Sequence, residues 1–263
     1  MTRRAGMLVV ATVVALTLVW GVAKAADGFG PPQVEYPTYP YDHRFTFARI
    51  KFEPSEWGFG RYAWGLDLKW NHDYPQAEQN FSKVLTEITG IDANVDGGNL
   101  IELSDPRLFD YPWAYMCEPG FWTPTEEELD NLRQYLLRGG FLVIDDFFDS
   151  LGFTPQWNNF EVQIRRLFPQ ATLVPLTVDQ KPFRLFFELE NLDFSDPNLF
   201  QFVPEMYGIF EDNDPTKRLL IAVNYNMDIG DYWEWSDQGL YPVNMTEKGF
   251  RLGVNYLMYG LTH

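Results

Sequence analysis

The sequence is short of cysteine, histidine and basic residues. Its 263 residues include one cysteine and three histidines, and 20 lysines and arginines stand against 37 aspartates and glutamates, for a net charge of −17. The single cysteine, Cys117, excludes an internal disulfide, and the scattered histidines have none of the ligand spacings of a zinc site. The acidic excess repels nucleic acid and anionic lipid. We therefore expect neither nucleic-acid binding nor zinc, and a fold that its core must stabilise.

Long apolar runs are equally rare, and the main one lies at the start of the chain. Residues 7–22 are apolar, two arginines precede them, and an Ala-x-Ala pattern follows at residues 23–25. These three features predict a secretory signal peptide over residues 1–25, hence a periplasmic or secreted protein. The alternative is an uncleaved inner-membrane anchor formed by residues 5–22. No later run is long enough to span a bilayer, so no stable membrane insertion is expected after cleavage.

The remainder divides into a short tether and one domain. Residues 26–44 are rich in proline, glycine and tyrosine without periodicity, which indicates a tether. Residues 45–263 alternate apolar strand patterns with helical ones, which predicts a single α/β domain: a three-layer α/β/α sandwich with a mainly parallel sheet. The expected main strands are 45–52, 100–103, 113–117, 141–144 and 219–223, with short ones at 173–174 and 184–188. The expected helices begin near Asp73, Thr123, Asn158 and Asn244.

Residues 123–149 are the most informative stretch. Thr123 is the expected helix cap, with Pro124 at the first helical position and Glu126 completing a capping box. Two glycines end the helix, and residues 141–144 form an uninterrupted apolar run, typical of a strand that is buried on both faces. Asp145 and Asp146 follow it, at the end of the strand where open α/β sheets bind their ligands.

Further acidic and polar side chains are expected at the same edge. Glu118 follows a neighbouring strand, and its approach to Asp145 and Asp146 would bring like charges together. A hard cation such as Ca²⁺ or Mg²⁺ would neutralise them. The alternative is structural: an aspartate caps a turn or pairs with an arginine such as Arg49.

Two more groups leave strands or loops at this edge. His72 and Asp73 precede a helix and would add a ligand or a general base at this edge, and the alternative for Asp73 is that it only caps the helix. Asn224, Asn226 and Asp228, followed by Asp231, leave the last strand and would hold a cation or a sugar. The alternative for this group is an ordinary turn.

Several aromatic residues lie in polar loops, where some should be exposed and stack on a saccharide or on a partner protein. The alternative is that they belong to the core. They are Trp57, Trp64, Trp70, Tyr232, Trp233 and Trp235.

Five spaced motifs resemble the bacterial family catalogued as domain of unknown function 4159: residues 73–75, 109–112, 118–121, 138–147, and 251–255 together with 259–263. The resemblance covers residues 45–263 and implies a fold similar to class I glutamine amidotransferases and trehalose-utilisation-like proteins. The glutaminases of that superfamily place a nucleophilic cysteine where this chain has Asp145. Cys117 belongs to the preceding strand and is expected to be a buried, inert thiol, and no histidine lies between His72 and His263. The catalytic triad is therefore absent, and glutamine hydrolysis is not expected.

Two hypotheses follow for function. The first is an exported envelope module without catalysis, which binds a partner protein or a saccharide at the carboxyl edge of the sheet. The second is a metal-dependent or carboxylate-dependent enzyme that acts on a sugar or cell-wall substrate, because two carboxylates can divide the acid and base roles.

Overall fold

A seven-stranded sheet lies at the centre of the computed structural model, which describes residues 36–56, 60–62, 65–150, 152–195 and 202–263. The expected signal segment at residues 1–25, most of the tether, Trp57 and Trp64 lie outside the described residues. Residues 38–263 form one compact unit. Within the described residues, no helix has the length and the apolar composition that crossing a membrane requires.

The sheet is mostly parallel, which confirms the predicted class. Five neighbouring strands are parallel: β4 (Asn99–Glu102), β1 (Ala48–Lys51), β5 (Trp113–Cys117), β6 (Phe141–Asp145) and β9 (Leu219–Tyr225). Two antiparallel strands complete it at one edge: β8 (Glu205–Phe210) and β7 (Val174–Pro175). The sequence analysis did not identify β8, which lies in a polar, proline-containing stretch. The expected strand at 184–188 is wrong, because these residues form bends and a loop.

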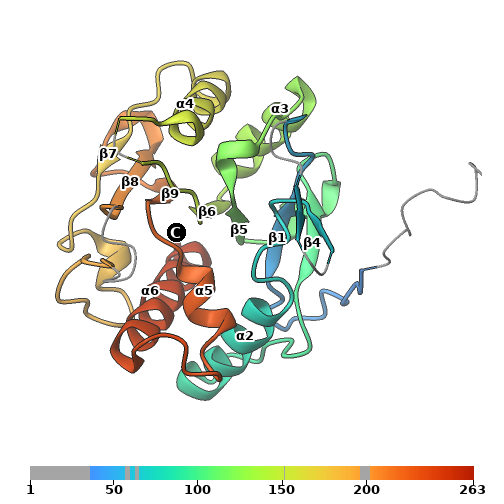
Figure 1. Ribbon diagram of the computed structural model, residues 1–263, viewed down its shortest axis with the longest axis vertical. Helices are drawn as coiled ribbons and strands as arrows, with labels where there is room; N and C mark the ends of the chain where they lie inside the picture. The colour runs from blue at the N-terminus through green and yellow to red at the C-terminus, as the bar shows by residue number, and fades with distance from the viewer. Residues whose placement is uncertain (1–35, 57–59, 63–64, 151, 196–201) are drawn as a thin grey trace, which may run out of the picture. The chain divides into compact units, whose positions relative to one another are not determined.

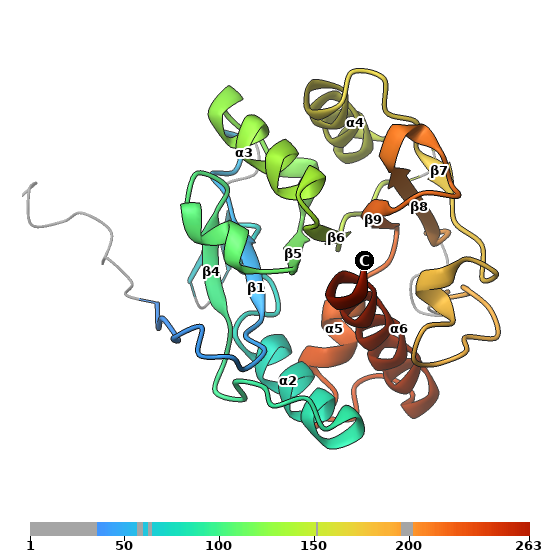
Figure 2. The ribbon, with the colours of Figure 1, turned by 180° about the vertical axis from the view of Figure 1, so that it is seen from behind.

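Five described α-helices flank the sheet. They are α2 (Gln76–Thr89), α3 (Glu126–Leu137), α4 (Pro155–Leu167), α5 (Ile229–Glu234) and α6 (Val243–Thr262). Figures 1 and 2 both show α3 and α4 together on one side of the sheet and α2, α5 and α6 on the other. A hairpin and four short 3₁₀ turns complete the described elements: β2 (Gly60–Tyr62), β3 (Gly65–Asp67), η2 (Pro106–Asp110), η3 (Pro119–Phe121), η4 (Lys181–Phe183) and η6 (Glu211–Asn213).

Four predicted helix starts need correction. Helix α4 begins at Pro155, three residues before the expected Asn158. Helix α3 is capped by Thr125, which forms the capping box with Glu128, two residues later than expected. This start puts three glutamates in the first turn, where they interact favourably with the helix dipole. Pro75 occupies the cap position of α2 and Pro242 that of α6, so neither Asp73 nor Asn244 caps a helix with its side chain.

Aromatic side chains fill the space between the sheet and the helices α2 and α5. The ring of Phe47 on the way into β1 lies 4.8 Å from that of Trp113, and Phe81 of α2 lies 4.8 Å from Trp233 of α5. Trp235 is partly exposed, whereas Trp70, Tyr232 and Trp233 are all buried, which agrees with the core alternative for these three. These residues form a rigid floor beneath the carboxyl edge of the sheet.

Candidate functional site

The ends of β5 and β6 bring two carboxylates together. The backbone N–H of Glu118 donates to the carbonyl oxygens of Asp145 and Asp146, at 3.1 and 3.2 Å. Glu118 and Asp146 both adopt the left-handed conformation, with φ of 52° and 55°. This conformation is uncommon for residues other than glycine, and it turns each side chain away from the direction of its strand. The carboxylates of Glu118, which follows β5, and of Asp146, which follows β6, therefore face the same region at the carboxyl edge of the sheet.

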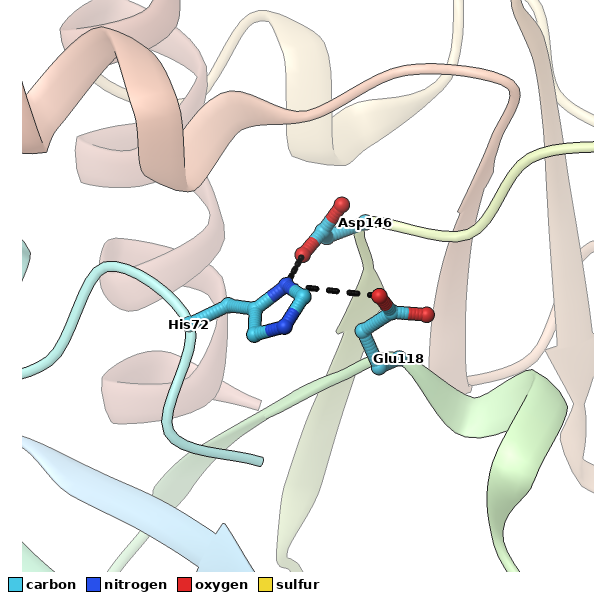
Figure 3. A group of neighbouring side chains, drawn as sticks. All are labelled: His72, Glu118 and Asp146. Atoms are coloured by element: carbon cyan, nitrogen blue, oxygen red, sulfur yellow. Dashed lines mark ion pairs between the residues drawn. The ribbon is translucent and has the colours of Figure 1, made fainter. Parts of the chain in front are cut away.

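His72 enters this space from the loop between β3 and α2. Its Nδ1 lies 3.3 Å from Glu118 Oε1 and 3.3 Å from Asp146 Oδ2, and Figure 3 shows the ring facing both carboxylates. Its Nε2 lies 3.1 Å from Asp67 Oδ1, and Lys69 Nζ donates to Asp67 Oδ2 at 2.8 Å. The carboxylate of Asp67 thus fixes the imidazole through Nε2, while Nδ1 faces Glu118 and Asp146.

Asp145 occupies a different place from its neighbour. It is fully buried and accepts four hydrogen bonds, from Tyr115 Oη, Asn224 Nδ2 and the backbone N–H groups of Ile229 and Gly230. Burial raises its pKa to about 6, although these four donors oppose the increase. The carboxylate of Asp145 therefore joins the sheet to the start of α5, and it does not face His72.

Arg49 lies under the site, with its side chain fully buried. It pairs with Glu78 of α2, which is also fully buried, rather than with either aspartate. Its Nη1 donates to the carbonyl oxygen of His72 at 2.8 Å and to Cys117 Sγ at 3.0 Å. Cys117 is buried as expected, and burial raises the pKa of its thiol well above the usual range. Arg49 therefore holds the loop that carries His72.

Four more acids continue the site beside Asp146. Three sets of side chains bring potential ligand atoms within 4.8 Å of one another: His72 with Glu118 and Asp146, Asp73 with Asp146 and Asp228, and Asp73 with Asp231 and Glu234. Asp228 also caps α5, because its Oδ1 accepts from Asp231 N at 2.9 Å. Asp146 is thus common to the first two sets.

The two asparagines of the predicted group serve the fold. Asn224 is fully buried between Asp145 and Tyr256, whose hydroxyl donates to Asn224 Oδ1 at 2.9 Å. Asn226 accepts from Asp149 N at 3.0 Å and donates to Val203 O at 3.2 Å. Of this group, Asp228 and Asp231 lie among the acids beside Asp146, and Asn226 lines the same cavity as they do.

Burial and mutual repulsion raise the pKa values of Glu118, Asp146 and Asp228. Burial raises the pKa of Glu118 to about 8, and the charge of Asp146 adds to the increase while His72 opposes it. Burial, with the neighbouring carboxylates, also holds the pKa values of Asp146 and Asp228 well above their usual range. A bound cation would remove this repulsion.

Two cavities meet at the acids. One, of about 270 Å³, has an aromatic wall that includes Phe194, Phe202 and Tyr241. The other, of about 480 Å³, is lined by Asp73 and Glu234. His72, Asp146, Asp228 and Asp231 line both.

The sequence analysis missed the groups that support the site. Asp67 is the last residue of β3 and Lys69 lies in the loop that carries His72. The one signal for both was their proximity in the sequence to His72, a candidate ligand. Glu78 lies on the inner face of α2, where a charged residue indicates a buried partner. Glu234 lies at the end of a short helix that the sequence pattern did not predict.

We expect the stability of the metal-free protein to fall as pH rises from about 4.5 to about 8. In this range folded Glu118 keeps a proton that the unfolded chain has released, because its pKa is raised from 4.5 to about 8. The folded state then binds more protons, so the free energy of unfolding decreases with pH, by up to about 1.4 kcal/mol per pH unit for one such group. Urea unfolding across this range, with a chelator present, measures the slope.

Glu118→Gln is the matched variant for this slope, since it cannot titrate and keeps the size of the side chain. The difference between wild type and variant should vary with pH. Parallel curves for the two proteins would contradict the assignment of the raised pKa to Glu118.

Comparison with known proteins identifies a family. A search of curated proteins found no match to this chain. A family profile matches residues 46–261, which include every strand of the sheet and every candidate ligand described above. The chain belongs to the family described as domain of unknown function (DUF4159).

Proposed function

We propose that this protein binds a divalent metal ion at the carboxyl edge of its sheet, with His72 Nδ1, Glu118 and Asp146 as the protein ligands. The observation that carries the proposal is the pair of 3.3 Å distances from His72 Nδ1 to the two carboxylates. Two atoms that bind one cation at right angles lie about 3.0–3.4 Å apart when each bond is about 2.1–2.4 Å long. The three side chains therefore have the spacing of neighbouring ligands around one ion.

The contacts behind His72 support the same role. Ligand histidines commonly donate their second ring N–H to a carboxylate, which fixes the ring and increases its basicity. Asp67 stands in that position, and Lys69 holds it in turn. With the proton on Nε2, the lone pair of Nδ1 faces two carboxylates, an arrangement that is repulsive unless a cation or a proton lies between them.

The ligand types favour some ions over others. One imidazole nitrogen with two carboxylates suits Mn²⁺, Zn²⁺ or Fe²⁺, whereas Ca²⁺ and Mg²⁺ prefer oxygen ligands alone. The site combines His72 with Glu118 and Asp146 rather than with Asp145. This shifts our proposal from the hard ions expected for an all-oxygen cluster toward Mn²⁺ and Zn²⁺. It also departs from the expectation against zinc, which rested on the spacing of histidines and cysteine in the sequence.

The test is direct titration of the tag-free, chelator-treated protein with Mn²⁺, Zn²⁺, Ca²⁺ and Mg²⁺ by calorimetry. His72→Ala is expected to weaken the tightest binding of Mn²⁺ by about 100-fold or more, because changes to groups that only orient a metal ligand already cost about 10–100-fold. His43→Ala, at an exposed histidine, is the matched control and should bind like wild type.

Two outcomes would refute the proposal. One is a wild-type protein that binds none of the four ions. The other is a His72→Ala variant with the affinity of wild type, which would move the site away from the imidazole.

A metal-dependent enzyme is the second candidate function. The observation in its favour is Glu234, which lines the larger cavity and whose pKa burial raises to about 7, near the value at which a carboxyl group exchanges protons at neutral pH. A bound cation would supply a Lewis acid, and the aromatic wall of the smaller cavity suits a sugar ring. Release of reducing ends from peptidoglycan that is lost in Glu234→Gln, with metal affinity unchanged, would distinguish the enzyme from a binding module.

The same proposal includes the fold family and the location. Helices on both sides of a mainly parallel sheet support a three-layer α/β/α sandwich of the glutamine amidotransferase-like kind. Glutamine hydrolysis is not part of the proposal, because the thiol of Cys117 is buried against Arg49. Export with cleavage of residues 1–25 rests on the signal pattern alone, and retention as an inner-membrane anchor is its alternative. In the envelope, a partner protein or a saccharide would reach the metal through the cavities.

A further inference from the structure

We infer that the site holds two divalent ions, with Asp146 as a carboxylate shared between them. The second ion would lie between Asp73, Asp146 and Asp228. This inference rests on the proposed function, because the first ion defines one side of Asp146. A second ion would make the single binding site a two-metal centre. Such centres stabilise both the attacking oxygen and the leaving oxygen of a displacement reaction.

The first support is the position of Asp146 in two sets of ligand atoms. One set contains His72 and Glu118, the other Asp73 and Asp228, and within each set all three atoms lie within 4.8 Å of one another. A carboxylate has two oxygens with about four lone-pair directions, so one aspartate can bind a cation on each side. The aspartate at the end of β6 is therefore placed to bridge.

The second support comes from buried carboxylate oxygens that have no hydrogen-bond partner among the described residues. Asp146 is 6% exposed, and among the described residues none forms a hydrogen bond with its Oδ2. Asp73 Oδ2 is likewise buried without a hydrogen-bond partner in the described part of the chain. Buried polar atoms nearly always have a partner, and an oxygen left without one destabilises the folded protein. Asp146 Oδ2 faces His72 Nδ1 and the first ion, whereas the unsatisfied oxygen of Asp73 belongs to a residue of the set proposed for the second ion.

The backbone beside Asp73 supports a fixed position for its carboxylate. An added Cβ on Gly230 would lie 2.2 Å from Asp73 Oδ2 and 2.8 Å from the hydroxyl of Tyr115. Only glycine lets the start of α5 come this close. The close approach confines Asp73 Oδ2 beside Gly230, which leaves the carboxylate little freedom to turn toward solvent.

The type of ligand atom in each set decides which cations fit. The second set offers three carboxylates and no nitrogen, which suits Mg²⁺, Mn²⁺ or Ca²⁺. Mn²⁺ is the one ion that fits both sets. It also reports on its own environment, since two Mn²⁺ ions that share a carboxylate are magnetically coupled and their resonance spectrum differs from that of isolated ions.

The test is the number of Mn²⁺ ions bound by the purified full-length protein, measured by calorimetry and by electron paramagnetic resonance. We expect two coupled ions in wild type, one uncoupled ion in Asp228→Asn, one in His72→Ala, and none in Asp146→Asn. Asparagine at 228 can still cap α5, so this variant should fold. Asp73→Asn serves as a second variant with the same expected loss of one ion. Asp237→Asn removes an equal charge from an exposed position just after α5, and this variant should still bind two ions.

The outcomes separate the two levels of inference. One ion in wild type, unchanged in Asp228→Asn and Asp73→Asn, would overturn the shared site and leave the proposed function intact. Two uncoupled ions that persist in Asp146→Asn would overturn the bridging role. No bound ion in wild type would overturn the proposed function and this inference together.

Discussion

Asp145→Ala is expected to decrease the free energy of unfolding by roughly 4 kcal/mol or more. We therefore assign Asp145 a structural role, although it is adjacent in the sequence to the candidate ligand Asp146. The substitution leaves four buried donors without an acceptor: Tyr115 Oη, Asn224 Nδ2 and two backbone N–H groups at the start of α5. Each unsatisfied buried donor costs about 1–3 kcal/mol. Urea unfolding followed by tryptophan fluorescence measures the loss, and Asp145→Asn, which keeps the shape and part of the bonding, should lie between the alanine variant and wild type.

Asp146→Asn is the matched control for Asp145→Asn, and it should not decrease the stability of the metal-free protein. Asp146→Asn removes a buried carboxylate whose raised pKa reflects burial and like charges, so the metal-free variant should be at least as stable as wild type. The same variant should lose its metal binding. Equal destabilisation by Asp145→Asn and Asp146→Asn would contradict the division of structural and ligand roles between the two aspartates.

Arg49→Met is expected to cost about 3–5 kcal/mol, because it leaves the buried carboxylate of Glu78 without its partner. The double variant Arg49→Met/Glu78→Gln removes both charges and should recover much of the loss. Denaturant unfolding of the two single variants and the double variant gives the coupling energy. Arg44→Met is the matched control, since Arg44 forms an exposed pair with Asp42 that should contribute little to stability.

The double variant also tests whether Arg49 positions the site. Arg49 Nη1 holds the carbonyl oxygens of Trp70 and His72 at 3.2 and 2.8 Å. A double variant that regains stability should therefore still bind metal more weakly than wild type. Wild-type affinity in the double variant would show that the loop of His72 keeps its position without the arginine.

The sequence alone determined the fold class, several strands and the edge of the sheet where the site lies. Apolar runs mark buried parallel strands, and residues 113–117 were predicted with the bounds that β5 has. The end of a strand follows from the same pattern, so Glu118, Asp145 and Asp146 were predicted to lie at one edge. These inferences depend on local composition and period, which the chain carries in a few consecutive residues.

Only the tertiary structure decided which of these side chains share a site. Asp145 and Asp146 are adjacent and chemically equal, yet the left-handed backbone of Asp146 turns it toward His72 while Asp145 remains in the strand and binds the start of α5. His72 and Asp228 reach Asp146 from loops far away in the chain, and no spacing in the sequence encodes that approach. A binding site depends on the directions in which side chains point in the folded protein. These directions depend on the backbone conformation of single residues and on contacts between segments that are distant in the sequence. A periodic pattern of apolar residues contains neither kind of information.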